Sequence, residues 1–284
     1  LSVACLSLLI WINTIVVASM LNTTGATRLS TSIPSSKEQS IWIVRYGLTR
    51  LPLVENVGPF DTDIDPIHGI KHTVAIANFI ADGVANTETF VFASPFQRTT
   101  QTACAIADAI NVTNSTYYKN NREKVIVRIE EGLMEWLTPA LVVTKSSNTR
   151  TYPKTTAELS QLFPGKIDPL YKSLNPPATK DSTSPKFPET EAALLLRANT
   201  TLTRLVKDSN LVSPSSSSTK RNIVIVSHAP CDQALAFALE GAKSPADSQL
   251  SYWPLGGITK FTSKVSSGSN DWVLDFYGRT HHMP

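Results

Sequence analysis

The chain of 284 residues has little cysteine, with three residues in all: Cys5, Cys104 and Cys231. Three cysteines cannot form a disulfide framework, and none of them has the Cys-x-x-Cys spacing of a structural zinc site. No other motif indicates a metal or a redox cofactor. We therefore expect a hydrophobic core to stabilise the fold, and we expect no bound metal or cofactor.

Charge is also scarce. Charged residues make up 17% of the chain, and 26 Lys and Arg against 23 Asp and Glu leave a formal net charge of +3. This small excess is not gathered into a long basic run, so the sequence does not indicate nucleic-acid binding. Because 42% of the residues are hydrophobic, the chain is not globally disordered. A bound anion would have to be held locally by a few residues.

Residues 1–20 contain no charged side chain. Their apolar content approaches the roughly 20 residues of a membrane-spanning helix, and it also fits a signal peptide that ends near Ala18 and Ser19. A buried core helix is the alternative, but the polar stretch 21–39, which we interpret as a linker, has no pattern to pack against it. Four sequons agree with a secretory route: Asn22, Asn111, Asn114 and Asn199. We expect a membrane-anchored or secretory-pathway protein, with a cytoplasmic location as the alternative.

From residue 40 onward, short apolar runs alternate with stretches of helical periodicity. The strand-like runs are residues 41–44, 90–93, 125–129, 223–226, 258–265 and 272–276. The helical stretches are residues 70–80, 99–110, 192–206 and 233–239. This alternation predicts the α/β class: a three-layer α/β/α sandwich with a mostly parallel central sheet, in one domain over residues 40–284.

Residues 137–188 differ from the rest of this domain, because they contain eight of the chain's 18 prolines. We expect little regular structure there. Long loops within a compact domain are usually functional. We therefore interpret residues 137–188 as a Pro-rich insertion that acts as a lid or a binding loop.

Polar residues suited to anion binding follow three of the predicted strands: Arg45 and Tyr46 with Arg50, then Ser94 and Arg98, and finally His228. In an open α/β sheet, ligands bind beyond the carboxyl ends of the strands. Guanidinium groups and an imidazole at such an edge would form a phosphate pocket, because Arg donates two parallel hydrogen bonds to an oxyanion. For any one of these residues alone, a surface ion pair or a hydrogen-bonded structural histidine is the simpler interpretation.

Together, the order and spacing of these motifs resemble the histidine phosphatase superfamily, also called the phosphoglycerate-mutase-like family. In that family an Arg-His-Gly motif follows the first strand, a Ser-Pro-x-x-Arg-x-x-Gln-Thr-Ala motif enters a helix, and a second His ends a late strand. Residues 41–47, 94–103 and 224–228 take these places. The stretch 128–136 is similar to the segment that carries the family's proton donor, which maps to Glu135. The Glu-Trp ending and the Pro-rich stretch look most similar to the T-cell ubiquitin-ligand and ecdysteroid phosphatase branch.

The resemblance implies a role for each matched residue. Arg45, Arg98 and His228 would hold the phosphoryl oxygens, and Glu135 would protonate the leaving group. Arg50 would be a further phosphate contact, at a position where the family's spacing varies. The other candidates near these motifs, His68, His72 and Cys231, do not occupy the position of the nucleophile, and we interpret them as structural.

One residue departs from the family pattern, because Tyr46 stands where the family has its nucleophilic histidine. That histidine accepts the phosphoryl group through a neutral nitrogen lone pair, which an imidazole supplies at physiological pH. A free phenol, with a reference pKa of about 10, is only about one-thousandth ionised at pH 7. Its oxygen also lies farther from the backbone, which would displace an in-line attack.

Three hypotheses fit these observations. The first is a histidine-phosphatase-fold protein that binds phosphate or phosphorylated ligands with absent or reduced phosphatase activity. The second is an active phosphomonoesterase that uses Tyr46, a water molecule or another group as nucleophile. The third is a membrane-anchored, non-catalytic interaction module. The expected partner of the first two is a phosphorylated small molecule or a phosphoprotein, and the sequence does not indicate an oligomeric state.

Overall fold

The computed structural model describes residues 38–50, 60–118, 123–139, 152–175, 188–207, 220–241, 253–266 and 269–283. The predicted signal peptide or anchor, residues 1–20, lies outside this part of the chain, as does nearly all of the predicted linker. None of the helices in the described ranges is long and apolar enough to cross a membrane.

A six-stranded sheet forms the centre of the described structure. Its strands are β1 (Glu38–Arg45), β2 (Glu88–Ala93), β3 (Val127–Ile129), β4 (Lys220–Ser227), β5 (Ile258–Ser266) and β6 (Ser269–Arg279). They lie in the order β3-β2-β4-β1-β5-β6. The first four in this order are parallel, and β5 and β6 are antiparallel. The predicted mostly parallel sheet is thus confirmed.

Strand β3 is shorter than the predicted strand 125–129. Both backbone groups of Val125 bond to the side-chain amide of Asn111 instead of to a neighbouring strand, each at 2.8 Å. This local competition between a side chain and the backbone ladder delays the strand until Val127.

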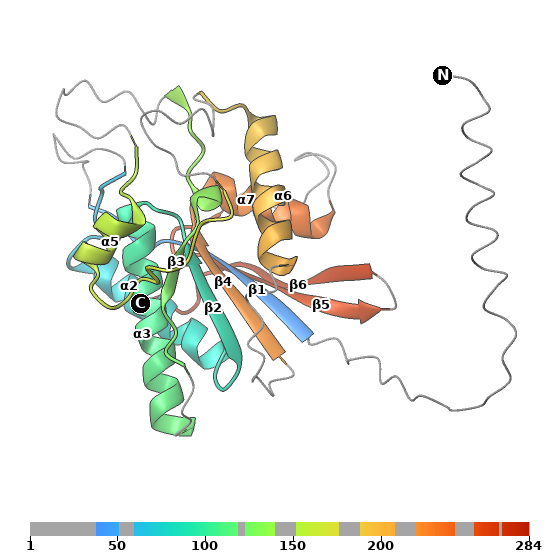
Figure 1. Ribbon diagram of the computed structural model, residues 1–284. Coiled ribbons are helices and arrows are strands. Elements are labelled where there is room, and N and C mark those ends of the chain that lie inside the picture. The colour runs from blue at the N-terminus through green and yellow to red at the C-terminus, as the bar shows by residue number, and fades with distance from the viewer. Residues whose placement is uncertain are drawn as a thin grey trace, which may run out of the picture. The chain divides into compact units, whose positions relative to one another are not determined.

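Helices cover both faces of the sheet (Figure 1). They are α2 (His68–Gly83), α3 (Gln97–Tyr118), the short 3₁₀ helix η1 (Glu131–Leu133), α5 (Thr156–Leu162), α6 (Glu191–Lys207) and α7 (Ala229–Glu240). Alternate residues of β1 point to opposite faces. Trp42 and Val44 pack in a core cluster with α2 and α3, whereas Ile41 and Ile43 pack with α6 and α7. The three-layer sandwich is therefore confirmed.

The described part of the Pro-rich insertion contains some regular structure. Helix α5 begins with a capping box between Thr155 and Glu158. After it, Ile167 forms an isolated parallel bridge to Val127 at the edge of the sheet. Residues 140–151 and 176–187 lie outside the described ranges, and the role of the insertion as a lid stays a prediction.

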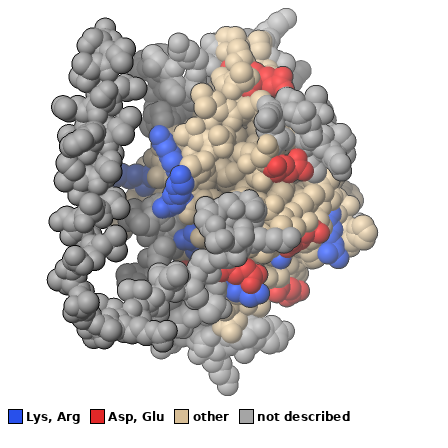
Figure 2. Space-filling view, turned by 90° about the vertical axis from the view of Figure 1, so that its right-hand side faces the viewer, with Lys and Arg blue, Asp and Glu red and all other residues tan. Residues whose placement is uncertain are grey.

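The charged side chains on one face of the molecule lie in small, separate groups among uncharged residues (Figure 2). Cys104 and Cys231 are buried and unbridged. Among the described residues, no group of three or more His, Cys, Asp or Glu side chains is placed to hold a metal ion.

Candidate functional site

Three parallel strands end at the same edge of the sheet. Arg45, the last residue of β1, lies opposite Ser227, the last residue of β4. Ala93, the last residue of β2, lies opposite Val226. The predicted motifs therefore meet at this edge, and the residues that directly follow the three strands are Tyr46, Ser94 and His228.

His228 lies at the centre of this edge and is fully buried. Its Nε2 is 2.9 Å from Oγ of Ser94, and its Nδ1 is 3.1 Å from Nη2 of Arg98. Because a guanidinium can only donate, Nδ1 is the acceptor, and Nε2 carries the proton that is donated to Ser94. Burial lowers the pKa of His228 to about 4. The imidazole is therefore neutral at physiological pH.

Glu135 follows η1 and faces the same two side chains. Its Oε2 is 3.8 Å from Nη2 of Arg98 and 3.4 Å from Nδ1 of His228. The backbone N–H of Trp136 donates to Oε1 at 3.1 Å. Burial raises the pKa of Glu135, but His228, Arg98 and the Trp136 hydrogen bond together outweigh burial and lower it. Glu135 is therefore a carboxylate at neutral pH.

The aromatic ring of Tyr46 packs on this cluster. Its centroid is 5.4 Å from that of His228, in an edge-to-face arrangement. The guanidinium carbon of Arg98 lies 4.7 Å from the centroid of Tyr46 and 4.8 Å from that of Phe96. These two rings hold the Arg98 guanidinium next to His228 through cation–π contacts.

Arg45 and Asp232 are two charged residues of this edge that do not bond to each other. Nη1 of Arg45 donates to the carbonyl of Trp253 at 2.5 Å, whereas its buried Nε has no hydrogen-bond partner within the described residues. Asp232, in the first turn of α7, is fully buried, and neither of its carboxyl oxygens has a partner there. Burial raises the pKa of Asp232 well above its usual range, although Arg45 acts to lower it.

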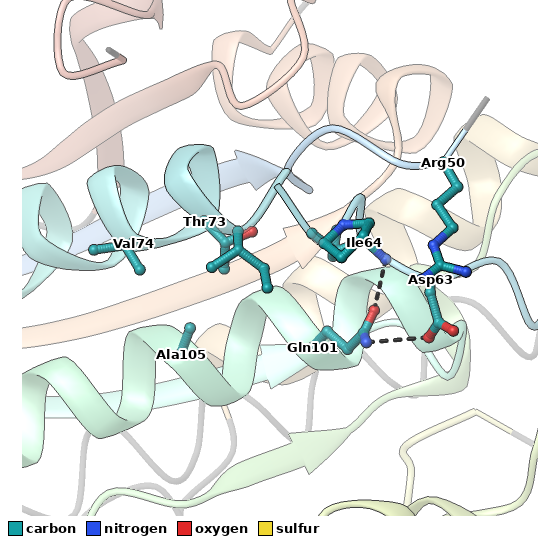
Figure 3. A pocket seen from close by; sticks show the side chains of 9 residues that line it. Arg50, Asp63, Ile64, Thr73, Val74, Gln101 and Ala105 are labelled. Carbon is teal, nitrogen blue, oxygen red and sulfur yellow. Dashed lines mark hydrogen bonds between the residues drawn. The ribbon is translucent and has the colours of Figure 1, made fainter. Parts of the chain in front are cut away.

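Arg50, an exposed residue, follows β1 by five residues. It lines a pocket of about 390 Å³ between α2 and α3, where its side chain lies beside Asp63 (Figure 3). The side-chain amide of Gln101 donates to Asp63 at 3.1 Å. The role of Arg50 as a phosphate contact stays a prediction.

The residues interpreted as structural lie in helices. His68 begins α2, where its backbone N–H donates to Oδ1 of Asp65 at 2.6 Å. His72 lies in the next turn of α2. Cys231 is fully buried in the first turn of α7, and burial raises the pKa of its thiol to about 12.

Arg197, in α6, fixes the backbone of the segment that carries Glu135. Its Nη1 donates to the carbonyls of Gly132 at 2.9 Å and Met134 at 3.0 Å, and its Nη2 donates to that of Glu135 at 3.3 Å. The same guanidinium forms two hydrogen bonds of 2.8 Å to the carboxylate of Glu189. The position of Glu135 thus depends on a buried ion pair on the α6 side of the sheet.

Glu130 links η1 to the end of the described part of the Pro-rich insertion. Its fully buried carboxylate accepts hydrogen bonds of 2.7 to 3.0 Å from five donors. These donors are the N–H of Gly132, Oγ of Ser173, Nδ2 of Asn175, the hydroxyl of Tyr171 and the N–H of Leu174. The carboxylate holds this strap, residues 171–175, against η1.

Three residues next to the site were not predicted from the sequence: Arg197, Glu130 and Asp232. For Arg197 and Asp232 a signal exists, because each is a charged residue at helical spacing among apolar residues that are buried in α6 and α7. Glu130 lies next to Glu131 in an irregular segment, and no pattern distinguishes the buried carboxylate from its neighbour.

Comparisons with known proteins give no match by sequence. No family model matches the chain, and no curated protein matches it.

Several solved structures are similar to the chain in fold. The ecdysone phosphate phosphatase from Bombix mori, in complex with tungstate, has a TM-score of 0.56 and 14% identity, over 87% of this chain and 93% of that chain. The native mycobacterial glucosyl-3-phosphoglycerate phosphatase has a TM-score of 0.54 and 17% identity, over 86% and 100%. The same mycobacterial phosphatase with inorganic phosphate has a TM-score of 0.53 and 17% identity, over 86% and 99%. At these identities the likeness establishes the fold, and the chain has the phosphoglycerate-mutase-like fold of the histidine phosphatases, as its motifs predict.

Proposed function

We propose that the edge formed by the ends of β1, β2 and β4 binds the phosphoryl group of a phosphate monoester. The observation that carries this proposal is the direct contact of Arg98 with His228 and Glu135 at the carboxyl ends of parallel strands. Arg45 lies at the end of the adjoining strand. Two guanidiniums and a neutral imidazole beside one carboxylate suit a tetrahedral oxyanion that also carries a leaving group.

The structural neighbours support this proposal. The ecdysone phosphate phosphatase holds tungstate and the mycobacterial phosphatase holds inorganic phosphate, and both ions are tetrahedral oxyanions. The ligand that we propose for this chain is a phosphorylated small molecule, with a phosphoprotein as the alternative. We also propose that the chain is most similar to the T-cell ubiquitin-ligand and ecdysteroid phosphatase branch, on the basis of the Glu-Trp pair at residues 135–136 and the Pro-rich stretch that follows it.

Turnover depends on residue 46. We propose that phosphatase activity is absent or reduced, because a neutral phenol is a poor nucleophile and the Tyr46 ring packs against His228 and Arg98. Glu135 adds a second requirement, since an ionised carboxylate must take up a proton before it can protonate a leaving group. A bound phosphoryl group favours that uptake, because it adds negative charge beside Glu135 and pairs with Arg98.

An active phosphomonoesterase is the second candidate. It is supported by the arrangement of Arg98, His228 and Glu135, to which the resemblance assigns phosphoryl binding and protonation of the leaving group. In this case the oxygen of Tyr46, or of a water molecule, forms a bond to phosphorus and loses its proton to solvent, while the bond from phosphorus to the leaving oxygen breaks. Glu135, once it has taken up a proton from solvent, donates that proton to the leaving oxygen.

The first test is hydrolysis of an aryl phosphate by the full chain, beside its Tyr46→His and Tyr46→Phe variants. We expect little turnover by the parent and by Tyr46→Phe, and a gain of at least about tenfold in Tyr46→His, because an imidazole restores the nitrogen nucleophile. Tyr46→Phe is the matched control, since it removes the hydroxyl oxygen alone.

The variants also separate the two candidates. If the parent is active and Tyr46→Phe is not, Tyr46 is the nucleophile, and the protein then carries an acid-stable phosphotyrosine after reaction with labelled substrate. If parent and Tyr46→Phe are equally active, a water molecule or another group attacks, and the proposal of reduced activity is wrong.

A further inference from the structure

Asp232 is a buried acidic residue that has no role in the phosphatase mechanism proposed above. It lies one helical turn after His228, and its backbone N–H donates to the carbonyl of His228 at 2.7 Å. Both carboxyl oxygens are buried without a hydrogen-bond partner in the described part of the chain. A buried carboxyl group without a partner is costly, so such a group points to a ligand or a water molecule that completes it.

The ionisable groups that face Asp232 come from three parts of the fold. Arg45 at the end of β1 and Glu135 after η1 both act on its carboxyl group, and Cys231 is its neighbour on α7. Nε of Arg45 is itself buried without a partner within the described residues. An acid and a guanidinium thus lie within electrostatic reach of each other in the anion site and remain unbonded.

The charge state of Asp232 determines whether Arg45 is available to bind an anion. An ionised Asp232 would pair with Arg45 and would repel the oxygens of a bound phosphoryl group. A neutral Asp232 would leave Arg45 available, and its O–H would donate a hydrogen bond to one of those oxygens.

We propose that Asp232 is a specificity-determining residue of the anion site: its neutral carboxyl group donates a hydrogen bond to a bound tetrahedral oxyanion, and its ionisation expels that anion. This inference rests on the proposed function, because it concerns the same site. It adds a group that decides at which pH the site accepts a doubly charged oxyanion.

The groups around Asp232 leave a pH range in which its own titration can be observed. The pKa of His228 is lowered to about 4 by burial, that of Cys231 is raised to about 12 by burial, and that of Glu135 is lowered. Among these four described groups, Asp232 is the one whose pKa is shifted toward the range between these limits.

The test is sulfate binding to the full chain, measured by calorimetry between about pH 5 and pH 9. Sulfate keeps both of its charges over this range, so a change in affinity reports on the protein. We expect the parent's affinity for sulfate to fall by about tenfold or more as the pH rises. Repulsion between two neighbouring negative charges corresponds to at least about one pKa unit, and one pKa unit is a tenfold change in affinity. Asp232→Asn is neutral at every pH and retains a donor, so its affinity for sulfate should fall with rising pH by much less than the parent's, and what remains is the proton uptake of Glu135.

Two further variants make the result specific. Asp232→Ala has neither charge nor donor, and we expect it to bind sulfate more weakly than Asp232→Asn does, with the same reduced pH dependence. Asp82→Asn removes one negative charge from an exposed position on α2. Its affinity for sulfate should change with pH as the parent's does.

The outcomes distinguish this inference from the proposed function. If sulfate binds and Asp232→Asn keeps the parent's pH dependence, the inference about Asp232 is wrong and the anion site remains. If the parent binds sulfate at no pH, the anion site itself is absent, and both proposals are overturned.

Discussion

At the scale of single residues, Arg197 connects the candidate site to the α6 side of the fold. The side chains of Arg197 and its partner Glu189 are 9% and 1% exposed. Each charge is therefore stabilised mainly by the other charge and not by water. Exposed ion pairs contribute little to stability, but removing one partner of a buried pair leaves a charge without compensation.

We expect Arg197→Met to lower the free energy of unfolding by about 3–5 kcal/mol, because Glu189 would remain buried without its cation. Urea unfolding measures this change. The matched control is Arg204→Met on the exposed face of the same helix, for which we expect a loss below about 1 kcal/mol. Equal losses in the two variants would show that the buried ion pair has no special role.

Tyr46 is the other residue that matters at this scale. The groups around it contact one another through hydrogen bonds, ion pairs and ring contacts. Replacing Tyr46 alone leaves these groups in place, so the replacement tests nucleophilic attack separately from anion binding.

At the scale of elements, the strap of residues 171–175 is attached to η1 mainly through Glu130. Gly132 of η1 allows this close approach, because a Cβ there would overlap Thr201 and Asn175. Since Glu135 lies two residues after η1, the strap and α6 together determine where the proposed acid lies.

Glu130→Gln should loosen this attachment. A glutamine retains one acceptor oxygen, but its NH₂ group cannot accept from the N–H of Leu174, so a buried donor is left unpaired at a cost of about 1–3 kcal/mol. We expect faster hydrogen exchange at the amide of Leu174, measured by NMR. Glu191→Gln, at the exposed start of α6, should leave that exchange unchanged. Protection of Leu174 at the parent's level in Glu130→Gln would contradict the role of the carboxylate.

At the scale of the whole molecule, stability should depend on pH through His228. Burial lowers the pKa of its imidazole from 6.5 to about 4. Below about pH 6.5 the His228 imidazole binds a proton in the unfolded chain, whereas in the folded chain it stays neutral down to about pH 4. The free energy of unfolding therefore falls as the pH decreases through this range.

The expected loss from His228 is about 2 kcal/mol between pH 7 and pH 5, since one pKa unit corresponds to about 1.4 kcal/mol. Denaturant unfolding of the parent and of His228→Asn at both pH values isolates this contribution as the difference between the two losses. The exposed His281 gives the control variant His281→Asn, which should lose as much as the parent. A loss in His228→Asn as large as the parent's would mean that His228 is not buried in its neutral form.

The sequence by itself predicted the layers of the molecule and the central members of the site. Strand runs and helical periodicity are local patterns, and they locate all six strands and the helices α2, α3, α6 and α7. The meeting of Arg45, Tyr46, Ser94 and His228 also follows from sequence, because the carboxyl ends of neighbouring parallel strands share one edge. The motif that contains Arg98 enters α3 beside that edge, as its spacing predicts.

Only the tertiary structure decided which distant side chains lie next to one another. Arg197 and Gly132 are 65 residues apart, and no periodicity relates an arginine on one helix to carbonyls on another segment. Arg50, which the resemblance counted as a phosphate contact, lies beside Asp63 in the pocket between α2 and α3. The physical reason is the same for Arg197 and for Asp232, which are both buried. Local patterns specify which face of an element is buried, whereas the partner of a buried charge depends on how the elements pack.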